Sequence, residues 1–119
     1  MKVFDKKGAF TKGELFNLSK GQGCTLLKKV PDGTEFQMTG YVILTDESTD
    51  IETGEKKEKN ILHIRTASGE VYTTESPTVI RTLGDAVEFM ETYELTFRLI
   101  RGTSKNGRVF MDLELLTEE

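Results

Sequence analysis

The sequence predicts a single, mainly β domain, and three observations carry this prediction. Apolar and polar residues alternate in several short segments that are separated by turn residues, which is typical of half-buried strands. The pair Asn106-Gly107 joins the last two of these segments, and such a pair is a strong β-hairpin signal. One long segment after Ser76 has apolar residues at helical spacing instead. The 119 residues, 36% of them hydrophobic, suffice for one compact fold but not for two.

Residues 1–33 are predicted to form an extension that packs on the main fold. Thr11 and Glu14 have the spacing of a capping box and precede apolar residues, which indicates a short helical turn. Pro31 then begins a reverse turn. The segment is neither of low complexity nor polar enough to be a free tail. We therefore expect an N-terminal extension at 1–33 and a main domain at 34–119.

Three strands are predicted in the first half of the main domain. The first covers residues 34–45 with a bend or bulge at Gly40, the second covers 60–67, and the third covers 70–74. The polar residues 46–59 form either a long exposed loop or the extended tip of a hairpin. Alternation assigns the following side chains to the interior: Phe36, Met38, Val42, Leu44, Leu62, Ile64 and Val71. It assigns the following to the exterior: Tyr41, His63, Arg65 and Tyr72.

A helix and a hairpin complete the predicted domain. Ser76 is a suitable N-cap, and Pro77 is suited to the first helical position. The helix then carries one apolar stripe, which consists of Val79, Leu83, Val87 and Met90. The hairpin has strands at 93–99 and 109–115 around a turn at 104–107.

Three strands, a helix and two further strands are the element order of an OB-fold. That fold is a five-stranded Greek-key barrel with one helix between strands three and four, and its ligands lie across strands two and three. The loops that flank the ligand would be residues 46–59 and 103–107 here. An open meander with a packed helix would give a similar pattern.

Basic and aromatic residues share the predicted outer surfaces, which is typical of a platform for single-stranded nucleic acid. Bases stack on aromatic rings and cations contact phosphates, and each stacked base contributes about 1–3 kcal/mol. The candidates for stacking are Tyr41, Tyr72 and Phe110. The candidates for phosphate contacts are Lys56, Lys57, Lys59, Arg65, Arg98, Lys105 and Arg108. Two other interpretations stay open: the tyrosines form ordinary cross-strand pairs, or the N-terminal segment covers Phe110.

The net charge of −4 argues at first against an anionic partner, but the charge is unevenly distributed. Residues 1–33 contain seven lysines and three acidic residues, a net of +4, whereas residues 34–119 have a net of −8. A ligand meets local surfaces rather than the average. We therefore expect the acidic residues mostly to face away from the bound strand.

Other classes of function find little support. The chain has one cysteine, Cys24, and one histidine, His63, so it predicts neither an internal disulfide nor a metal site. Residues 21–26 lack the third glycine of a dinucleotide fingerprint, and no phosphate-binding loop occurs. No apolar run is long enough for a membrane span or a secretory signal. We expect a cytoplasmic non-enzyme without a cofactor, in which His63 is a satisfied strand residue.

Two stretches resemble small phage-encoded single-stranded DNA-binding proteins, particularly those of viruses that infect Gram-positive bacteria. They are Gly69-Glu70-Val71-Tyr72-Thr73-Thr74-Glu75-Ser76 and Gly102-Thr103-Ser104-Lys105-Asn106-Gly107-Arg108-Val109-Phe110. The resemblance implies an OB-fold that coats single strands in replication or recombination inside the bacterial host cell, without sequence preference. By motif match, it implies the contact residues Tyr72, Lys105, Arg108 and Phe110. Its implied partners are single-stranded DNA and replication or recombination proteins, although the long acidic tail of many such proteins is not found here.

An alternative function uses the same barrel without nucleic acid. The protein would be an interaction or structural assembly module, with the acidic face of the helix as its contact surface and the outer aromatic residues sealing a subunit interface. This hypothesis predicts a homo-oligomer whose association is indifferent to oligonucleotides. An OB domain that binds RNA or carbohydrate is a third alternative.

Overall fold

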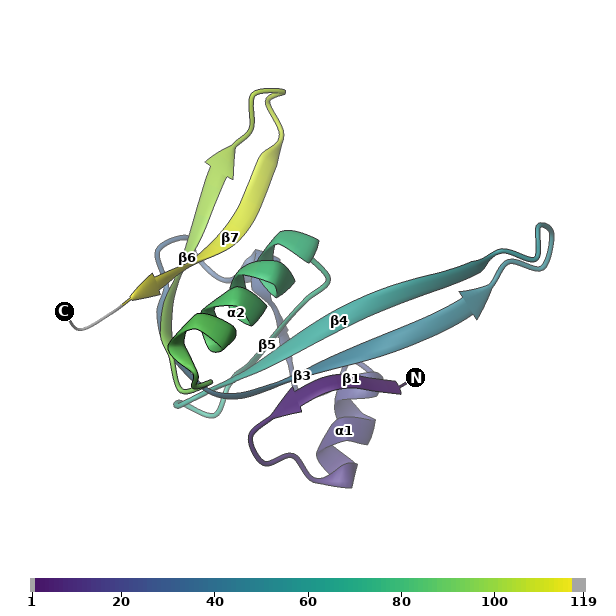
Figure 1. Cartoon of the computed structure of the whole chain (residues 1–119), viewed down its shortest axis with the longest axis horizontal. Coiled ribbons are helices and arrows are strands. Elements are labelled where there is room, and N and C mark those ends of the chain that lie inside the picture. Colours follow the sequence, from purple (N-terminus) through teal and green to yellow (C-terminus); the bar gives the residue numbers. More distant parts are fainter. Residues whose placement is uncertain (1, 117–119) are drawn as a thin grey trace.

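The computed structural model describes residues 2–116, which form seven strands, two α-helices and a short 3₁₀ segment (Figure 1). The mainly β class is therefore confirmed. In chain order the elements are β1 (Lys2–Lys7), α1 (Lys12–Ser19), β2 (Thr25–Leu26), η1 (Leu27–Lys29), β3 (Glu35–Thr49), β4 (Lys56–Thr66), β5 (Val71–Thr74), α2 (Pro77–Met90), β6 (Thr96–Thr103) and β7 (Val109–Leu116).

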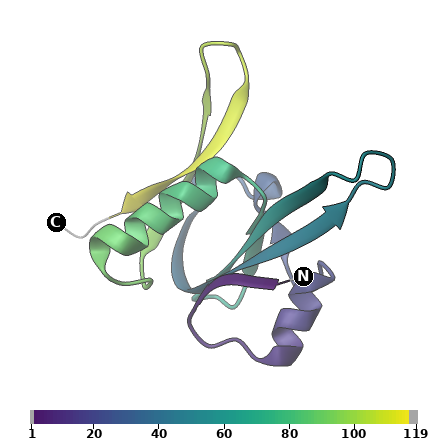
Figure 2. The same ribbon diagram turned by 45° about the vertical axis from the view of Figure 1, so that its right-hand side comes forward.

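The long strand β3 organises a curled sheet with the order β2-β5-β4-β3-β6-β7. Its first residues pair with β6, its middle pairs with β1, and most of its length pairs with β4. All of these pairs are antiparallel, whereas β2 pairs with β5 in parallel. Figure 2 shows the sheet curving around α2, so that the helix covers the concave side.

The predicted closed barrel with five strands and a single helix is not found. The predicted order of three strands, a helix and two strands is present as β3, β4, β5, α2, β6 and β7. Within residues 2–116, however, no ladder joins β5 to β7, and β2 occupies that edge of β5 instead. The sheet is therefore a half-barrel, and the N-terminal segment contributes strands to it.

The main hydrophobic core lies between the concave side of the sheet and α2. Ser76 caps the helix as predicted, because its Oγ accepts a hydrogen bond from the Val79 amide at 3.3 Å. Val79 and Leu83 are fully buried against the sheet. Met90 is exposed, so the predicted apolar stripe does not reach the end of the helix.

A β-bulge at residues 38–40 reverses the alternation of β3. Met38 pairs with Thr66 and Gly40 pairs with Arg65, so β3 has one more residue than β4 at this point. After the bulge, Tyr41 faces the main core. The prediction of a bend or bulge at Gly40 is confirmed. The interior assignment of Val42 and Leu44 to the same face as Phe36 and Met38 is wrong, because these two pack in a second cluster on the other side of the sheet.

The N-terminal segment covers the convex side of the sheet. Leu18 of α1 packs against Val42 and Leu44 in this second cluster. The predicted capping box is confirmed: the Glu14 amide donates to Thr11 Oγ1 at 3.1 Å, and the Thr11 amide donates to Glu14 Oε1 at 3.2 Å. Val42 and Leu44 on the convex side are thereby buried.

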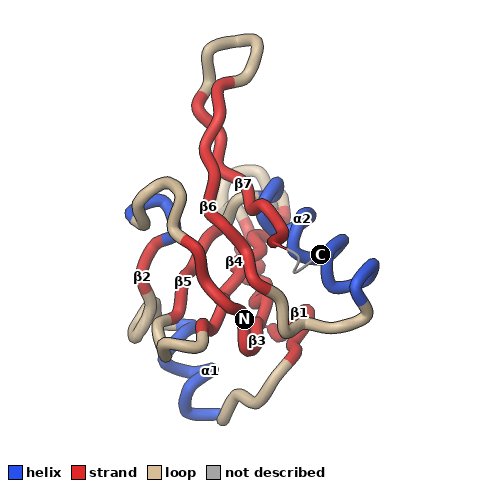
Figure 3. Tube along the Cα trace, turned by 90° about the vertical axis from the view of Figure 1, so that its left-hand side faces the viewer, coloured by secondary structure: helices blue, strands red, loops and turns tan. Residues whose placement is uncertain are grey.

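Two hairpins extend from the body as arms (Figure 1). Residues 46–59 take the second of the two predicted forms, the extended hairpin tip, with Asp46 opposite Lys59 and Thr49 opposite Lys56. The predicted hairpin around residues 104–107 is also present, and Figure 3 shows β6 and β7 rising well clear of the other strands. The molecule measures 52 × 41 × 26 Å, so the arms make it longer and broader than it is deep.

Two glycines allow a direct test of the packing at the bulge. A Cβ at Gly40 would lie 2.9 Å from the Lys7 carbonyl oxygen, whereas a Cβ at Gly84 within α2 would meet nothing within 4 Å. We expect Gly40→Ala to lower the free energy of unfolding by about 1 kcal/mol or more, because backbone must move. Gly84→Ala should raise it by about 0.5–1 kcal/mol, because alanine is the better helix former. Urea denaturation of both variants measures these changes, and equal effects would contradict the close approach at Gly40.

Candidate nucleic-acid interface

A groove of about 550 Å³ lies on the convex side of β4 and β5, between the end of α1 and the base of the β6–β7 arm. We call it the outer groove. Its lining comes from five parts of the chain: Leu18, Ser19 and Gly21 at and just after the end of α1, Cys24, Leu26 and Lys28 around β2, Asp46 from β3, Ile61, His63, Thr73, Thr74 and Glu75 from β4, β5 and the residue after β5, and Met111 from β7. Apolar walls with a few polar groups are typical of sites that bind small organic groups.

Tyr41 and Tyr72 do not lie on an outer face, so their predicted exterior position is wrong. They are only 2% and 7% exposed, respectively. Tyr41 Oη donates a hydrogen bond to Asp5 Oδ2 at 2.7 Å, and Tyr72 Oη donates to Glu70 Oε2 at 3.0 Å. Burial, reinforced by these carboxylates, raises the pKa of both phenols. A buried ring cannot stack on a base in this conformation.

The register of the strands explains the error at Tyr72. Tyr72 pairs with Ile64, whose side chain lies in the main core, and directly opposed residues share one face of a sheet. Its ring meets Phe36 edge-on, with 5.3 Å between the ring centroids. Val71, predicted to be interior, packs with the second cluster on the convex side instead.

Phe110 is the predicted stacking residue that is accessible. It is 42% exposed and lies on the β6–β7 arm, opposite Gly102. The ring packs against this glycine so closely that a Cβ at position 102 would lie 2.5 Å from Phe110 Cζ. Glycine therefore gives the ring a backbone surface on one side, and much of the rest of the ring is free to meet a ligand.

The predicted phosphate contacts divide into free and paired cations. Within the described part of the chain, four of them are exposed and make no ion pair: Lys56, Lys57, Lys105 and Arg108. Three others are paired with carboxylates: Lys59 with Glu75 at 2.5 Å, Arg98 with Glu114 at 2.8 Å and with Glu35 at 3.4 Å, and Arg65 with Glu14. The free cations lie on the two arms.

Arg65 connects the sheet to the N-terminal segment. Its guanidinium donates hydrogen bonds to the Ala9 carbonyl oxygen and to Glu14, and it lies 4.0 Å from the centroid of the Phe10 ring. Both terminal nitrogens of the guanidinium are therefore used: Nη1 donates to Ala9, and Nη2 donates to Glu14. The prediction that Arg65 faces outward is confirmed only in the sense that it lies on the convex side, where the N-terminal segment covers it.

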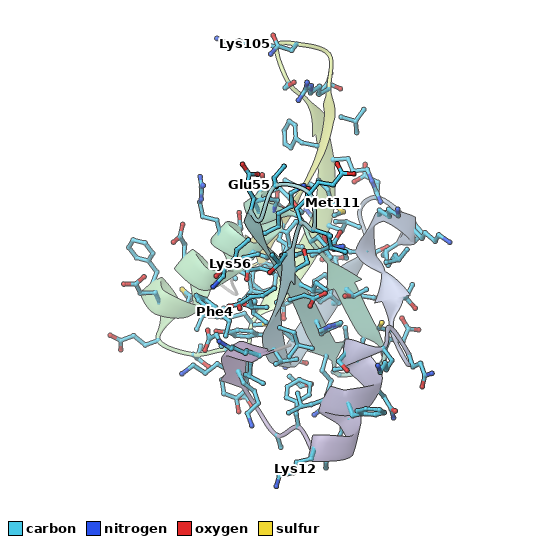
Figure 4. All side chains as sticks on the ribbon, turned by 90° about the vertical axis from the view of Figure 1, so that its right-hand side faces the viewer. Phe4, Lys12, Glu55, Lys56, Lys105 and Met111 are labelled. Atoms are coloured by element: carbon cyan, nitrogen blue, oxygen red, sulfur yellow. The ribbon has the colours of Figure 1, made fainter. Side chains whose placement is uncertain are left out.

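The outer groove and the β3–β4 arm share one face. The β3–β4 ladder has no register shift beyond Gly40, so successive side chains of β4 alternate between two faces. Lys57 and Lys59 therefore lie on the same face as His63, whereas Lys56 lies on the opposite face. Figure 4 shows Lys105 at the tip of the other arm and Met111 near its base, with Lys12 of α1 at the opposite end of the molecule.

His63 is buried in the floor of the outer groove, which the sequence pattern did not indicate. It is 2% exposed, and neither ring nitrogen makes a hydrogen bond with any group of residues 2–116. The prediction of a satisfied strand histidine is therefore wrong. Burial lowers the pKa of its imidazole to about 4, so the ring is neutral at pH 7. Alternation placed His63 on the correct side of β4, but the groove beside it is also lined by residues of α1 and β2, which come from distant sequence.

Comparison with known proteins identifies the family. A family model described as Phage Single-stranded DNA-binding protein matches residues 2–116, which is nearly the whole chain. The chain belongs to this family of phage proteins. The resemblance carried by residues 69–76 and 102–110 is thereby confirmed.

Two curated relatives of the family carry the name Single-stranded DNA-binding protein, one from Bacillus phage PZA and one from Bacillus phage phi29. Each is 30% identical to this chain over 116 residues, which cover 95% of the chain and 91% of the relative. No solved structure matches the protein. Membership of the family confirms the expectation of a non-enzyme. Among the described helices, none is long and apolar enough to cross a membrane.

Proposed function

We propose that this protein binds single-stranded DNA without sequence preference, by stacking bases on Phe110 and by contacting phosphates with the cations of the two arms. The observation that carries the proposal is the family match over residues 2–116, together with two relatives whose names say that they bind single-stranded DNA. The free cations and the accessible aromatic ring support it, because both occur on the arms.

The β6–β7 arm combines both kinds of contact. Phe110 lies near its tip, and Lys105 and Arg108 belong to or adjoin the turn that closes it. A ring that is already held against Gly102 loses little conformational freedom when a base stacks on it. Because every base has an aromatic face and every nucleotide has a phosphate, such contacts do not discriminate between sequences.

The β3–β4 arm supplies phosphate contacts alone. Lys56 and Lys57 lie on opposite faces of the arm, and acidic residues such as Glu47 and Glu58 are interspersed with them. Mixed charges of this kind give weak, adjustable attraction rather than a tight clamp. This arm therefore attracts the strand weakly through phosphate contacts, whereas the β6–β7 arm binds it through both stacking and phosphate contacts.

The biological role that follows is the coating of single strands during phage replication or recombination in the host cell. The fold itself is best described as a derivative of the OB-fold. The order of β3, β4, β5, α2, β6 and β7 supports this description, as does the pairing of β3 with β6. Assembly into oligomers and contacts with replication proteins are compatible with this role.

Binding should show the salt dependence of four phosphate contacts. Four free cations predict that log K for a labelled oligothymidine falls with log salt concentration with a slope of about −3. Replacing Lys105 and Arg108 together by alanine should reduce the slope to about −1.4, since two contacts remain. Fluorescence anisotropy at several salt concentrations measures the slope. Lys12→Ala is the matched control, because this exposed lysine lies on α1, far from the arms (Figure 4).

The same titration tests the proposed function itself. No binding of oligothymidine at low salt would refute it. A stable oligomer in light scattering that forms equally with and without oligonucleotide, combined with no binding, would favour the assembly module instead.

A further inference from the structure

We propose that Phe4 of β1 is a second stacking residue for single-stranded DNA, and that the hollow beside its ring receives one base of the bound strand. The inference rests on the proposed function, because it adds a contact with the same ligand. It concerns β1, which takes part neither in the stacking on Phe110 nor in the phosphate contacts of the arms.

A β-bulge turns Phe4 out of the ladder of an edge strand. Within residues 2–116, β1 pairs with β3 and with no other strand. Val3 is opposite Leu44 and Asp5 is opposite Ile43, so Phe4 is the extra residue between two adjacent pairs. Bulges of this kind occur at sheet edges and change the direction of a side chain. The bulge therefore frees the Phe4 side chain from the alternation of β1.

The Phe4 ring is accessible, although the backbone beside it is held in place. The Asp5 carboxylate accepts hydrogen bonds from Tyr41 Oη at 2.7 Å and from the Lys6 amide at 2.9 Å. Phe4 is 70% exposed, compared with 42% for Phe110. Single exposed aromatic residues are common on protein surfaces, so the surroundings of the ring decide what it can bind.

An open hollow of about 310 Å³ adjoins the ring, and we call it the edge hollow. Figure 1 shows β1 beside β3 where the β3–β4 arm begins. This volume is at the lower end of the range for sites that bind small organic groups. The lining consists of Lys2, Val3 and Phe4 of β1, Thr45 and Glu47 of β3, and Glu58 and Asn60 of β4.

The edge hollow offers a hydrogen-bond donor and an acceptor to the edge of a base. The Thr45 hydroxyl donates to Asn60 Oδ1 at 2.7 Å and so orients the Asn60 amide. Within residues 2–116, the amide nitrogen of Asn60 makes no hydrogen bond and the Glu58 carboxylate makes no ion pair. In a single strand the edges of the bases are open to such groups. Because every base carries both donors and acceptors, the hollow is compatible with any sequence.

The charges of the edge hollow favour a base over a phosphate. Glu47 and Glu58 are directly opposite each other in the β3–β4 ladder. Lys2 lies 3.7 Å from Glu47 and offsets one of the two charges. The second carboxylate disfavours an anion, whereas it can accept a hydrogen bond from the N–H group of a neutral base.

A strand that contacts the β3–β4 arm passes the edge hollow. The β3–β4 ladder has no register shift over this part of β4, so Lys56, Glu58 and Asn60 lie on one face. Two residues of a strand span about 7 Å, which places Lys56 one such step beyond the wall of the hollow. A phosphate that contacts Lys56 therefore brings a neighbouring base close to Phe4.

A tryptophan at position 4 gives a direct readout, because the chain contains no tryptophan. A base that stacks on an indole quenches its fluorescence. We expect oligothymidine to quench Phe4→Trp strongly and an abasic oligonucleotide of equal length to leave its emission unchanged. Phe89→Trp is the matched control, since Phe89 is 86% exposed near the end of α2, and oligothymidine should not alter its emission.

The outcomes separate this inference from the proposed function. Oligothymidine binding to Phe4→Trp in anisotropy without quenching would overturn the contact at Phe4 while the function stands. Failure of oligothymidine to bind the wild-type protein at low salt would overturn both. Equal quenching by the abasic strand would show that the ring meets the sugar-phosphate backbone rather than a base, and would also overturn the inference.

Phe4→Ala gives an independent measure without a fluorophore. Affinity for oligothymidine should fall roughly fivefold, which is the lower end of the effect of one stacked base. We expect the lower end because the more exposed Phe4 ring loses more conformational freedom on binding than Phe110 does. The salt dependence should keep its slope, since no charge is removed.

Light scattering of wild type and Phe4→Ala tests another occupant, a second copy of the chain. Unchanged affinity of Phe4→Ala for oligothymidine would contradict the stacking contact. If the variant at the same time loses an oligomer that the wild type forms, the ring lies at an interface between copies and the inference is wrong.

Discussion

Phe110→Ala is expected to weaken the binding of oligothymidine by roughly 5- to 150-fold, because base stacking on an aromatic ring contributes about 1–3 kcal/mol per base. The ring is accessible, and Gly102 holds it in place on the arm. The substitution removes no charge. We therefore expect the salt dependence of binding to keep its slope while the affinity falls at every salt concentration.

A matched control tests whether the effect belongs to this site. Phe89 is 86% exposed near the end of α2, so Phe89→Ala removes a comparable ring from a surface outside the proposed interface. It should bind oligothymidine as the wild-type protein does. Equal affinities of wild type, Phe110→Ala and Phe89→Ala would show that Phe110 does not stack on a base. Anisotropy at fixed salt measures all three.

A second glycine substitution distinguishes stacking from simple arm geometry. A Cβ at Gly102 would collide with the Phe110 ring, so Gly102→Ala must displace the ring while leaving it in the chain. If a pre-positioned ring is important, affinity falls in this variant as well. Unchanged affinity would mean that the ring stacks equally well from another position on the arm.

Features that depend on neighbouring residues could be predicted from the sequence. The N-cap at Ser76, the capping box of Thr11 and Glu14, and the turn at Asn106-Gly107 all occur where expected. Each reflects a hydrogen bond or backbone conformation that a few adjacent residues determine. Phe110 and the arm cations belong to the same group, since the hairpin that presents them is a local structure.

Which side chains of the central strands point into the core could not be predicted in the same way. A single bulge residue inverts the alternation of a strand, and its consequences depend on where the partner strand resumes pairing. Gly40 suggested the bulge, but only the register of β3 with β4 shows that Tyr41 turns into the core. At Tyr72 alternation gave the wrong face, because a four-residue strand has too few positions to define a face.

The site on the convex side depends on contacts between distant segments. The N-terminal residues pair with β3 and β5 and place α1 over the sheet, where Glu14 meets Arg65 across an interval of 51 residues. No periodicity within one segment indicates such a contact. The same covering segment forms a wall of the outer groove, so the groove could be found only in the folded chain.

The buried imidazole of His63 should also make the protein less stable in mild acid. The folded state holds the pKa of His63 near 4, whereas the ordinary value is 6.5, so the unfolded chain binds the proton more readily. Stability due to the neutral ring is therefore complete above about pH 6.5 and is lost as the pH falls toward 4. Between pH 7 and pH 4.5 the wild-type protein should lose about 2 kcal/mol more than His63→Phe.

Urea denaturation of both proteins at the two pH values measures this difference. The comparison removes the contribution of the acidic residues, since Asp46, Glu75 and the other carboxylates are common to both chains. Identical losses for the wild type and His63→Phe would show that the imidazole accepts a proton without unfolding, which requires a partner or a solvent path in the groove.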